Sequence, residues 1–424
     1  MRRDIGIFWS GVFLLVLSTT SLAEPVERRR DQFGRDFGYY VYPIAGEIPG
    51  LGKASGAGAS VLNMGDGDAD LTGYIIRGDF KASGLALLDY HLIPQRLIFD
   101  VGYNDFLVAP IQYQRGIASD PQDTIQPKVE GKYVLGQVTL TYDERRYEVF
   151  ARLLNGRQRL LSVLDKSGQS FPNIDSNWKR SHSIALGGSI DRTDDRLDPR
   201  SGLRFEFASK LPQNSPADYS EFYVNDYNFT GYLPMRKWDT LAFNVFHSHA
   251  YISRQGLTDY ATIQQRYGLN CSQYADPAQQ SACLAAETQL IDGYLAYNLH
   301  GIATSLGGTQ RLRSYDNGRF YAGQSLSYGV EYRWNLTDER TPFNIYVAKG
   351  IRTGIQLAAF WERGMVADRF SDLFKDGRNS YGVGARMVLS GVVIRFDLAQ
   401  GNEGAQSQLF ITYPWSMFSV DNPN

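Results

Sequence analysis

The chain has 424 residues, of which 42 are glycine, 27 tyrosine and 23 phenylalanine, and its formal net charge is −2. This balance excludes a protein whose main partner is nucleic acid, because such a protein carries an excess of lysine and arginine. Downstream of the N-terminus, no uncharged apolar run is long enough for a helix to cross a bilayer, which excludes a helical membrane protein. Glycine and aromatic enrichment over many short alternating segments favours an all-β protein.

The N-terminus has the pattern of a secretory signal. Residues 1–23, "MRRDIGIFWSGVFLLVLSTTSLA", combine a basic start, an apolar stretch and the small residues Ser21 and Ala23. The apolar stretch is shorter than the roughly 18 residues that the alternative, a retained membrane anchor, requires. We therefore expect a signal peptide cleaved after Ala23. Residues 24–50 are then a short periplasmic N-terminal segment.

Segments with a two-residue hydrophobic period follow, between about residues 51 and 418. In residues 325–336, "SLSYGVEYRWNL", apolar side chains alternate with polar ones, and residues 202–209 and 392–400 repeat the pattern. Successive side chains of a strand face opposite sides, so one face suits lipid and the other suits water. The charged residues that the pattern places on the water-filled side are Arg204, Glu206, Glu331, Arg333 and Arg395.

The length of these segments separates two all-β architectures. A soluble β-sandwich, the alternative, has strands of about 5 or 6 residues. The segments here approach the roughly 9 to 11 residues that a tilted strand needs to cross a bilayer. Residues 51–418 therefore predict a transmembrane antiparallel β-barrel of about 16 strands, whose lumen has room for water or an infolded loop.

Two connecting segments stand out. Residues 191–202, "DRTDDRLDPRSG", predict a solvated turn, because their carboxylates lack the ligand spacing of a calcium loop, the alternative. Residues 255–295 are polar, rich in alanine and without alternation, which predicts a partly helical external loop. The loop contains Cys271 and Cys283, the two cysteines of the chain. Outside the cytoplasm we expect them to form a disulfide, with a metal pair as the alternative.

The order of several motifs resembles a known family. Residues 307–323, "GGTQRLRSYDNGRFYAG", are followed by "YGVEYRW", "GIQLAAFWERGMV" and "YGVGARMVLSGVVIRFDLAQG". This order is similar to the C-terminal half of the BamA/TamA type of surface-antigen barrels, and the likeness extends over residues 181–415. The resemblance implies a barrel in the bacterial outer membrane with an infolded lumenal loop.

The resemblance also implies a lumenal latch. In the family, a loop with an Arg-Gly-aromatic tip folds into the lumen, where its arginine meets carboxylates on neighbouring strands. The corresponding residues here are Arg313 and Tyr315, with Ser314 in place of the glycine, and the carboxylates are Glu362 and Asp397. Both carboxylates lie on polar faces independently of the resemblance. The alternative places Arg313 in water on an external loop, as we expect for Arg311, which has no assigned partner.

Two departures from the family are visible. The few tens of residues between Ala23 and the first strand leave no room for POTRA modules, which are periplasmic domains that receive clients. At the other end, the strand predicted over residues 408–415 puts Tyr413 and Trp415 on the lipid side and Pro414 at a sheet edge. Phe418 is then followed by a short tail, residues 419–424. We expect a hinge at the seam between the first and last strands.

Three functional classes remain. The resemblance favours insertion or translocation of polypeptide, or lipid, across the outer membrane through a gated lumen and a weak strand seam. The alternatives are a passive pore or structural surface antigen and, less favoured, a barrel enzyme acting on lipid. His247 and His249, the one close histidine pair, fall on the lipid side, so we expect no enzyme. The expected partners are outer-membrane lipid and a polypeptide client or separate periplasmic partner, with no nucleic acid, metal or cofactor.

Overall fold

The computed structural model describes residues 37–65, 69–164, 168, 170, 175–212, 215–236, 239–273, 275–338, 343–351, 353–389, 392–411, 413–415 and 417. The expected signal peptide, the periplasmic segment as far as residue 36, and the tail at 419–424 lie outside the described residues.

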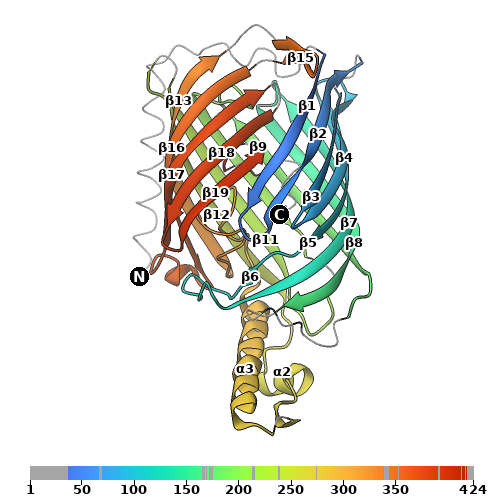
Figure 1. The fold of residues 1–424 in the computed structure, drawn as a ribbon, viewed down its shortest axis with the longest axis vertical. Coiled ribbons are helices and arrows are strands. Elements are labelled where there is room, and N and C mark those ends of the chain that lie inside the picture. The colour runs from blue at the N-terminus through green and yellow to red at the C-terminus, as the bar shows by residue number, and fades with distance from the viewer. Residues whose placement is uncertain are drawn as a thin grey trace.

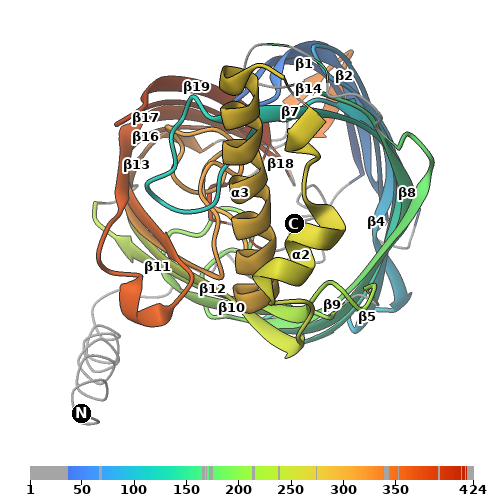
Figure 2. The ribbon, with the colours of Figure 1, turned by 90° about the horizontal axis from the view of Figure 1, so that it is seen from below.

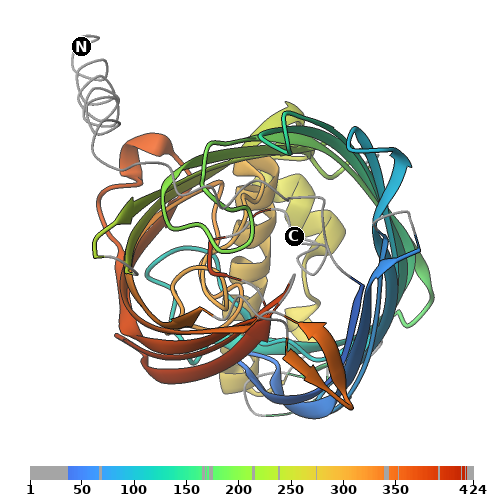
Figure 3. The ribbon, with the colours of Figure 1, turned by 90° about the horizontal axis from the view of Figure 1, so that it is seen from above.

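Nineteen strands are described, and sixteen of them are long enough to build a barrel wall. Each long strand pairs antiparallel with the next long strand of the sequence. Figures 1, 2 and 3 show the resulting barrel, which confirms the predicted fold class and strand number. The long strands are β1 (Gly38–Ile48), β2 (Gly52–Met64), β3 (Ala69–Gly78), β4 (Lys81–Ile93), β5 (Leu97–Val108), β7 (Thr124–Tyr142), β8 (Tyr147–Leu164), β9 (Lys179–Asp191), β10 (Gly202–Lys210), β11 (Glu221–Pro234), β12 (Thr240–Arg254), β13 (Gln324–Asp338), β16 (Thr353–Ala367), β17 (Arg378–Leu389), β18 (Val392–Gly401) and β19 (Gly404–Ile411). The short ones are β6 (Gln112–Tyr113), β14 (Phe343–Ile345) and β15 (Ala348–Ile351).

The wall is apolar outside and polar inside. On β13, Val330 and Trp334 point outward and are 41% and 40% exposed, whereas Glu331 and Arg333 point into the lumen and are 0% and 1% exposed. A soluble protein would bury the apolar set. The reversed pattern is stable only where hydrocarbon surrounds the wall, as around a transmembrane barrel.

One end of the barrel carries the long connections. Between β12 and β13 the chain forms α2 (Tyr260–Tyr267), the 3-10 turn η1 (Cys271–Gln273) and α3 (Pro277–His300), which project below the barrel in Figure 1. The side chains of Asp259 and Asp276 cap the first turns of α2 and α3. A disulfide joins Cys271 to Cys283. The helical part of the predicted external loop thus extends beyond residue 295, to His300.

The described helices are all too short or too polar to cross a bilayer.

The barrel closes at a seam between β1 and β19. A side chain added at Gly46 of β1 would lie 2.9 Å from the Cβ of Leu409 of β19, so the two strands are neighbours. Nevertheless, the described residues of these strands form no backbone ladder with each other, whereas β1 pairs with β2 over its whole length. β15 pairs with β1 at Tyr39 and Tyr40. Among the described residues, β1 and β19 are therefore neighbours that share no backbone ladder.

If the outer face contacts lipid, the loss of stability caused by a charged residue on that face should depend on its depth in the membrane. Leu153 points outward near mid-height of β8 and is 50% exposed. Leu153→Arg should lower the free energy of unfolding in vesicles by about 2–4 kcal/mol, because the cation enters hydrocarbon. Asn155→Arg, one outward position nearer the long-loop end, should cost less. Urea unfolding followed by tryptophan fluorescence measures both, and equal costs would contradict a membrane around this part of the wall.

Candidate functional site

The chain between α3 and β13 folds back into the lumen. Leu306 and Phe320 exchange backbone hydrogen bonds of 2.8 and 3.0 Å, which makes this segment an infolded hairpin. Its apolar side chains are buried with Phe246 of β12 in one cluster that includes Leu306, Leu312, Tyr315 and Phe320. Leu312 has a positive φ of 53°, and this turn presents the next residue, Arg313, to the barrel wall.

Arg313 is completely buried among three carboxylates. Its Nε lies 3.1 Å from Glu362 Oε1, and its Nη1 lies 3.0 Å from both Glu331 Oε2 and Asp397 Oδ2. The guanidinium also stacks 3.4 Å from the centroid of the Phe360 ring. The structure therefore brings together Arg313, Glu362 and Asp397, and it adds Glu331, which the strand period had placed only on the lumenal face.

Further arginines balance these carboxylates. Arg333 Nε lies 2.8 Å from Glu331 Oε1, and Arg386 Nη2 lies 2.7 Å from Glu331 Oε2. Arg395 Nη1 lies 3.0 Å from Asp397 Oδ2. Arg386 did not emerge from the sequence analysis, although the two-residue period of β17 points it inward. We call Arg313, Arg333, Arg386, Arg395, Glu331, Glu362 and Asp397 the lumenal charge network.

The network keeps Arg313 charged. Burial by itself would lower the pKa of Arg313, but Glu362, Asp397 and Glu331 raise it above its ordinary value. Buried pairs of this kind offset the cost of desolvation only when the geometry is complete. Removal of Arg313 would leave the three carboxylates buried with only the arginines of the wall.

The neighbouring tip residues are also anchored. Ser314 N donates to Ser380 Oγ at 3.0 Å, and Tyr315 Oη donates to the carbonyl of Asn379 at 3.1 Å. Ser314 is not among the residues with a positive φ, so the tip does not need the glycine of the family. A glycine is required instead on the facing strand β18: a Cβ at Gly401 would lie 2.3 Å from Ser314 Oγ.

The expectation for Arg311 is wrong. Its side chain is buried, with the guanidinium 3.8 Å from the centroid of the Phe246 ring and Nη2 3.1 Å from Asn228 Oδ1. Burial lowers the pKa of Arg311 to about 10, although Asp226, Glu206 and Glu362 oppose the shift. The infolded hairpin carries Arg311 against the inner face of β11 and β12, which a loop in solvent would not do.

The C-terminal segment departs most from the sequence expectation. β19 ends at Ile411, and Tyr413, Pro414 and Trp415 turn into the lumen instead of continuing the lipid-facing strand. Pro414 has no amide hydrogen, and Trp415 has a positive φ of 70°, so the strand cannot continue here.

Polar groups of the wall hold the inward segment. Trp415 Nε1 donates to Glu362 Oε1 at 3.0 Å, and Asn228 Nδ2 donates to the Trp415 carbonyl at 2.8 Å. Tyr413 Oη lies 2.6 Å from Asp198 Oδ1 and 2.8 Å from Gln356 Oε1. The last residues therefore share Glu362 with Arg313.

The turn at residues 191–202 is not a solvated turn. Asp198 is buried and meets Tyr413, while Asp194 Oδ1 accepts from the amides of Arg200 and Ser201 at 2.8 and 2.9 Å. Asp195 Oδ1 accepts from the amides of Leu197 and Asp198 at 2.8 Å. The carboxylates of the turn thus bind its own backbone and the C-terminal segment.

The remaining residues singled out in the sequence lie on the expected faces. Arg204 reaches Asp191 at 2.9 Å and Glu206 accepts from Asn228 at 2.6 Å, both on the lumenal side. His247 and His249 lie on the outer face, where His247 stacks on Tyr227 with ring centroids 6.3 Å apart.

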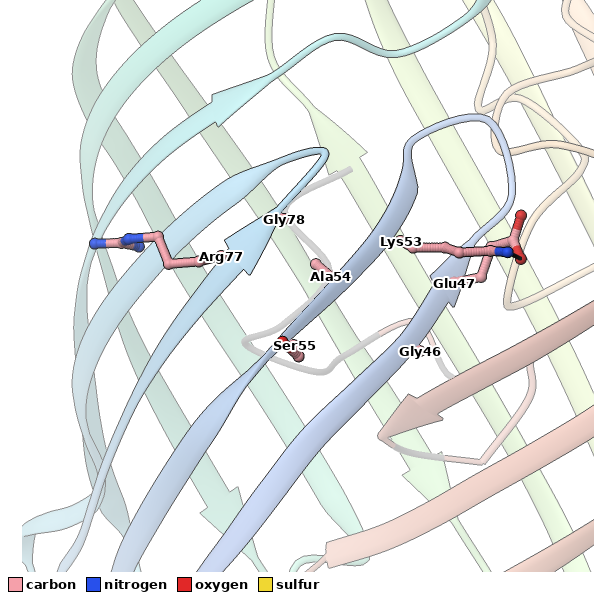
Figure 4. Close-up of a pocket in the computed structure, with 7 residues that line it drawn as sticks. All are labelled: Gly46, Glu47, Lys53, Ala54, Ser55, Arg77 and Gly78. Carbon is pink, nitrogen blue, oxygen red and sulfur yellow. Dashed lines mark ion pairs between the residues drawn. The ribbon is translucent and has the colours of Figure 1, made fainter.

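A shallow hollow at the long-loop ends of β1, β2 and β3 is shown in Figure 4. Its ion pair, Glu47 with Lys53 at 3.8 Å, is exposed and contributes under about 1 kcal/mol. Arg77 extends to the opposite side from this pair (Figure 4), so the charged groups do not converge on one ligand. The hollow is lined by Gly46, Glu47, Lys53, Ala54, Ser55, Arg77 and Gly78.

Substitution of Arg313 tests the network. Arg313→Ala should lower the free energy of unfolding by about 3–5 kcal/mol, because it leaves the buried Glu362 without the cation that it pairs with among the described residues. The temperature at which the barrel loses its compact mobility in SDS gels should fall, and single-channel conductance should rise. Arg266→Ala, at an exposed position of α2, is the control. Unchanged heat resistance together with unchanged conductance would contradict a latch at Arg313.

Substitution of Trp415 tests the inward segment separately. Trp415→Phe keeps an aromatic ring but removes the N–H that Glu362 accepts, which should cost about 1.5–3 kcal/mol, the range for hydrogen bonds to charged groups. Trp334→Phe, on the lipid face, should cost less. The same gel assay and urea unfolding measure both, and an equal effect of the two changes would contradict the role of the indole N–H.

Comparison with known proteins finds likenesses among solved structures. No protein-family model matches the chain, and a search of curated proteins finds no match. The chain is similar to BamA from Haemophilus ducreyi lacking POTRA domains 1–3, with TM-score 0.45 and 13% identity over 89% of this chain and 69% of that one. It is similar to CdiB from Escherichia coli, with TM-score 0.48 and 10% identity, over 88% of this chain and 61% of that one. It is similar to OccD3 from Pseudomonas aeruginosa, with TM-score 0.32 and 11% identity, over 94% and 96% of the two chains.

Proposed function

We propose that this protein is a bacterial outer-membrane barrel that inserts or translocates polypeptide, or lipid, through a gated lumen and the seam between β1 and β19. The seam is the observation that carries the proposal. Elsewhere around the wall, every long strand pairs with its sequence neighbours, so the barrel has a single preferred place to open.

The seam has the chemistry of a strand-accepting edge. The seam-facing edge of β1 pairs with β15 at Tyr39 and Tyr40. Beyond that short pairing, the edges of β1 and β19 that face each other carry backbone N–H and C=O groups that no ladder uses among the described residues. Such groups form a template for an incoming strand, which gains main-chain hydrogen bonds when it adds to a sheet edge. An extended polypeptide segment is therefore the client that best fits the seam.

The contents of the lumen favour gating over a passive pore. The infolded hairpin and the C-terminal segment fill the lumen beside β11–β13 and β16–β18. The lumenal charge network ties the hairpin to strands on one side of the seam. A client that enters from the lumen meets these contacts first, and their loss would free the hairpin and the C-terminal segment, while β19 would keep its ladder with β18.

A disulfide lock across the seam tests this function. Gly46 and Leu409 face each other, so Gly46→Cys with Leu409→Cys should bridge β1 to β19 on oxidation. In proteoliposomes, the reduced pair should speed the folding of a urea-unfolded outer-membrane barrel polypeptide, measured by its heat-modifiable gel mobility. Oxidation should remove most of that acceleration, and reduction should restore it.

The matched control places a disulfide where the strands already pair. Leu85 of β4 and Tyr103 of β5 are opposite each other in register and both face outward. Cysteines at these two positions should leave the acceleration unchanged on oxidation. Equal activity of the oxidised seam pair, or no acceleration by the unmodified protein, would refute the proposed function and leave the pore as its replacement.

A further inference from the structure

Three cations of adjacent strands form one row on the outer wall. Lys132 of β7 lies directly opposite Arg157 of β8, and Arg157 lies directly opposite Arg180 of β9. Residues directly opposite in an antiparallel pair point to the same side of the sheet. Lys132, Arg157 and Arg180 therefore share a face, and we call them the cationic row.

The cationic row faces away from the lumen. Two residues further along β7, on the same face, Val134 is 46% exposed. Leu153 of β8 and Ile184 of β9, four residues from the row on the same face, are 50% and 42% exposed. These apolar side chains belong to the lipid-facing band. The cationic row therefore lies at the edge of that band that is nearest the long loops.

The height of the row matches a lipid headgroup. At the opposite end of the same face, Tyr142 and Tyr147 pair in register with ring centroids 6.4 Å apart, as an interfacial aromatic pair would. Ten residues separate Tyr142 from Lys132 on β7. At about 3.3 Å per residue and a tilt near 40°, they span roughly 25 Å along the membrane normal, which is the height of the apolar band of such barrels.

The cations of the row keep donors available. Lys132 Nζ lies 3.0 Å from Asp105 Oδ2, and the Arg157 guanidinium lies 4.9 Å from the centroid of the Trp178 ring. Arg157 and Arg180 are exposed, and neither forms an ion pair within the part of the chain that the structure describes. Arg159, on the same face of β8, also stacks on Trp178 at 4.9 Å and pairs with Glu130 at 2.6 Å.

We propose that the cationic row binds the phosphate groups of a phosphorylated glycolipid in the outer leaflet. Guanidinium groups donate two parallel hydrogen bonds to phosphate, and Lys132 adds a point charge. The apolar side chains between the row and the middle of the barrel cover the acyl chains of the same lipid. A free anion would make no contact with these side chains. Trp178 lies at the depth where aromatic rings favour the interface. The inference rests on the proposed function only for the location in an outer membrane.

The test is lipid binding by the full chain in detergent micelles, followed by native mass spectrometry with bis-phosphorylated lipid A as the probe. The variant Lys132→Gln with Arg157→Gln and Arg180→Gln should bind the probe at least about tenfold more weakly. The control removes three exposed, ion-paired cations elsewhere, at Lys53, Arg266 and Lys375, and should bind like the unmodified protein. Dephosphorylated lipid A should bind the unmodified protein as weakly as the row variant binds the probe.

Two results would overturn the proposal. One is equal binding of the probe by the row variant and the unmodified protein. The other is displacement of the probe by inorganic phosphate, which would reveal a free-anion site. Heat-modifiable gel mobility shows that each variant is folded, and the charge-preserving variant Arg157→Lys with Arg180→Lys should recover part of the binding. The assay uses no client, so its outcome is independent of the seam-lock experiment.

Discussion

The burial of one guanidinium among three carboxylates organises the lumen. Glu331, Glu362 and Asp397 come from β13, β16 and β18, so Arg313 links three strands to the tip of an infolded hairpin. In a dry site each of these charges is costly without the others, because desolvation exceeds what a single pair returns. In the observed position of the hairpin, Arg313 pairs with Glu362, and the apolar cluster with Phe246 forms in the same position.

The same network reaches the end of the chain. Trp415 donates to Glu362, and Gln408 of β19 donates to the carbonyl of Arg313. The last strand, which lacks a ladder with β1 among the described residues, is thus tied to the lumen by side chains. Such contacts can break one by one, whereas a ladder loses many hydrogen bonds in register. The physical connection between seam and lumen is the basis on which gating is proposed.

The outer wall is chemically uneven around the barrel. β7 and β8, with 19 and 18 residues, are the longest strands described. They carry outward-facing charges at the long-loop end and outward-facing apolar side chains nearer the middle of the barrel. The projecting helical hairpin lies at the same end (Figure 1). Charges at the long-loop end meet lipid headgroups, whereas charges nearer the middle of the same outer face would meet hydrocarbon.

The two-residue period of the sequence determined the two faces of the wall and the approximate number of strands, because alternation is a local property of an extended chain. It also placed Glu331, Arg333 and Arg395 on the lumenal side, and the motif order pointed to Arg313, Glu362 and Asp397 as a set. Only the tertiary structure decided that Glu331 joins that set and that Arg311 is buried. Both depend on register between strands and on the path of an infolded loop, which local patterns do not record. The inward turn of Tyr413 and Trp415 was decided in the same way: their period matches a lipid-facing strand, but hydrogen bonds to Asp198, Gln356 and Glu362, residues 53 or more positions away in the chain, hold them in the lumen.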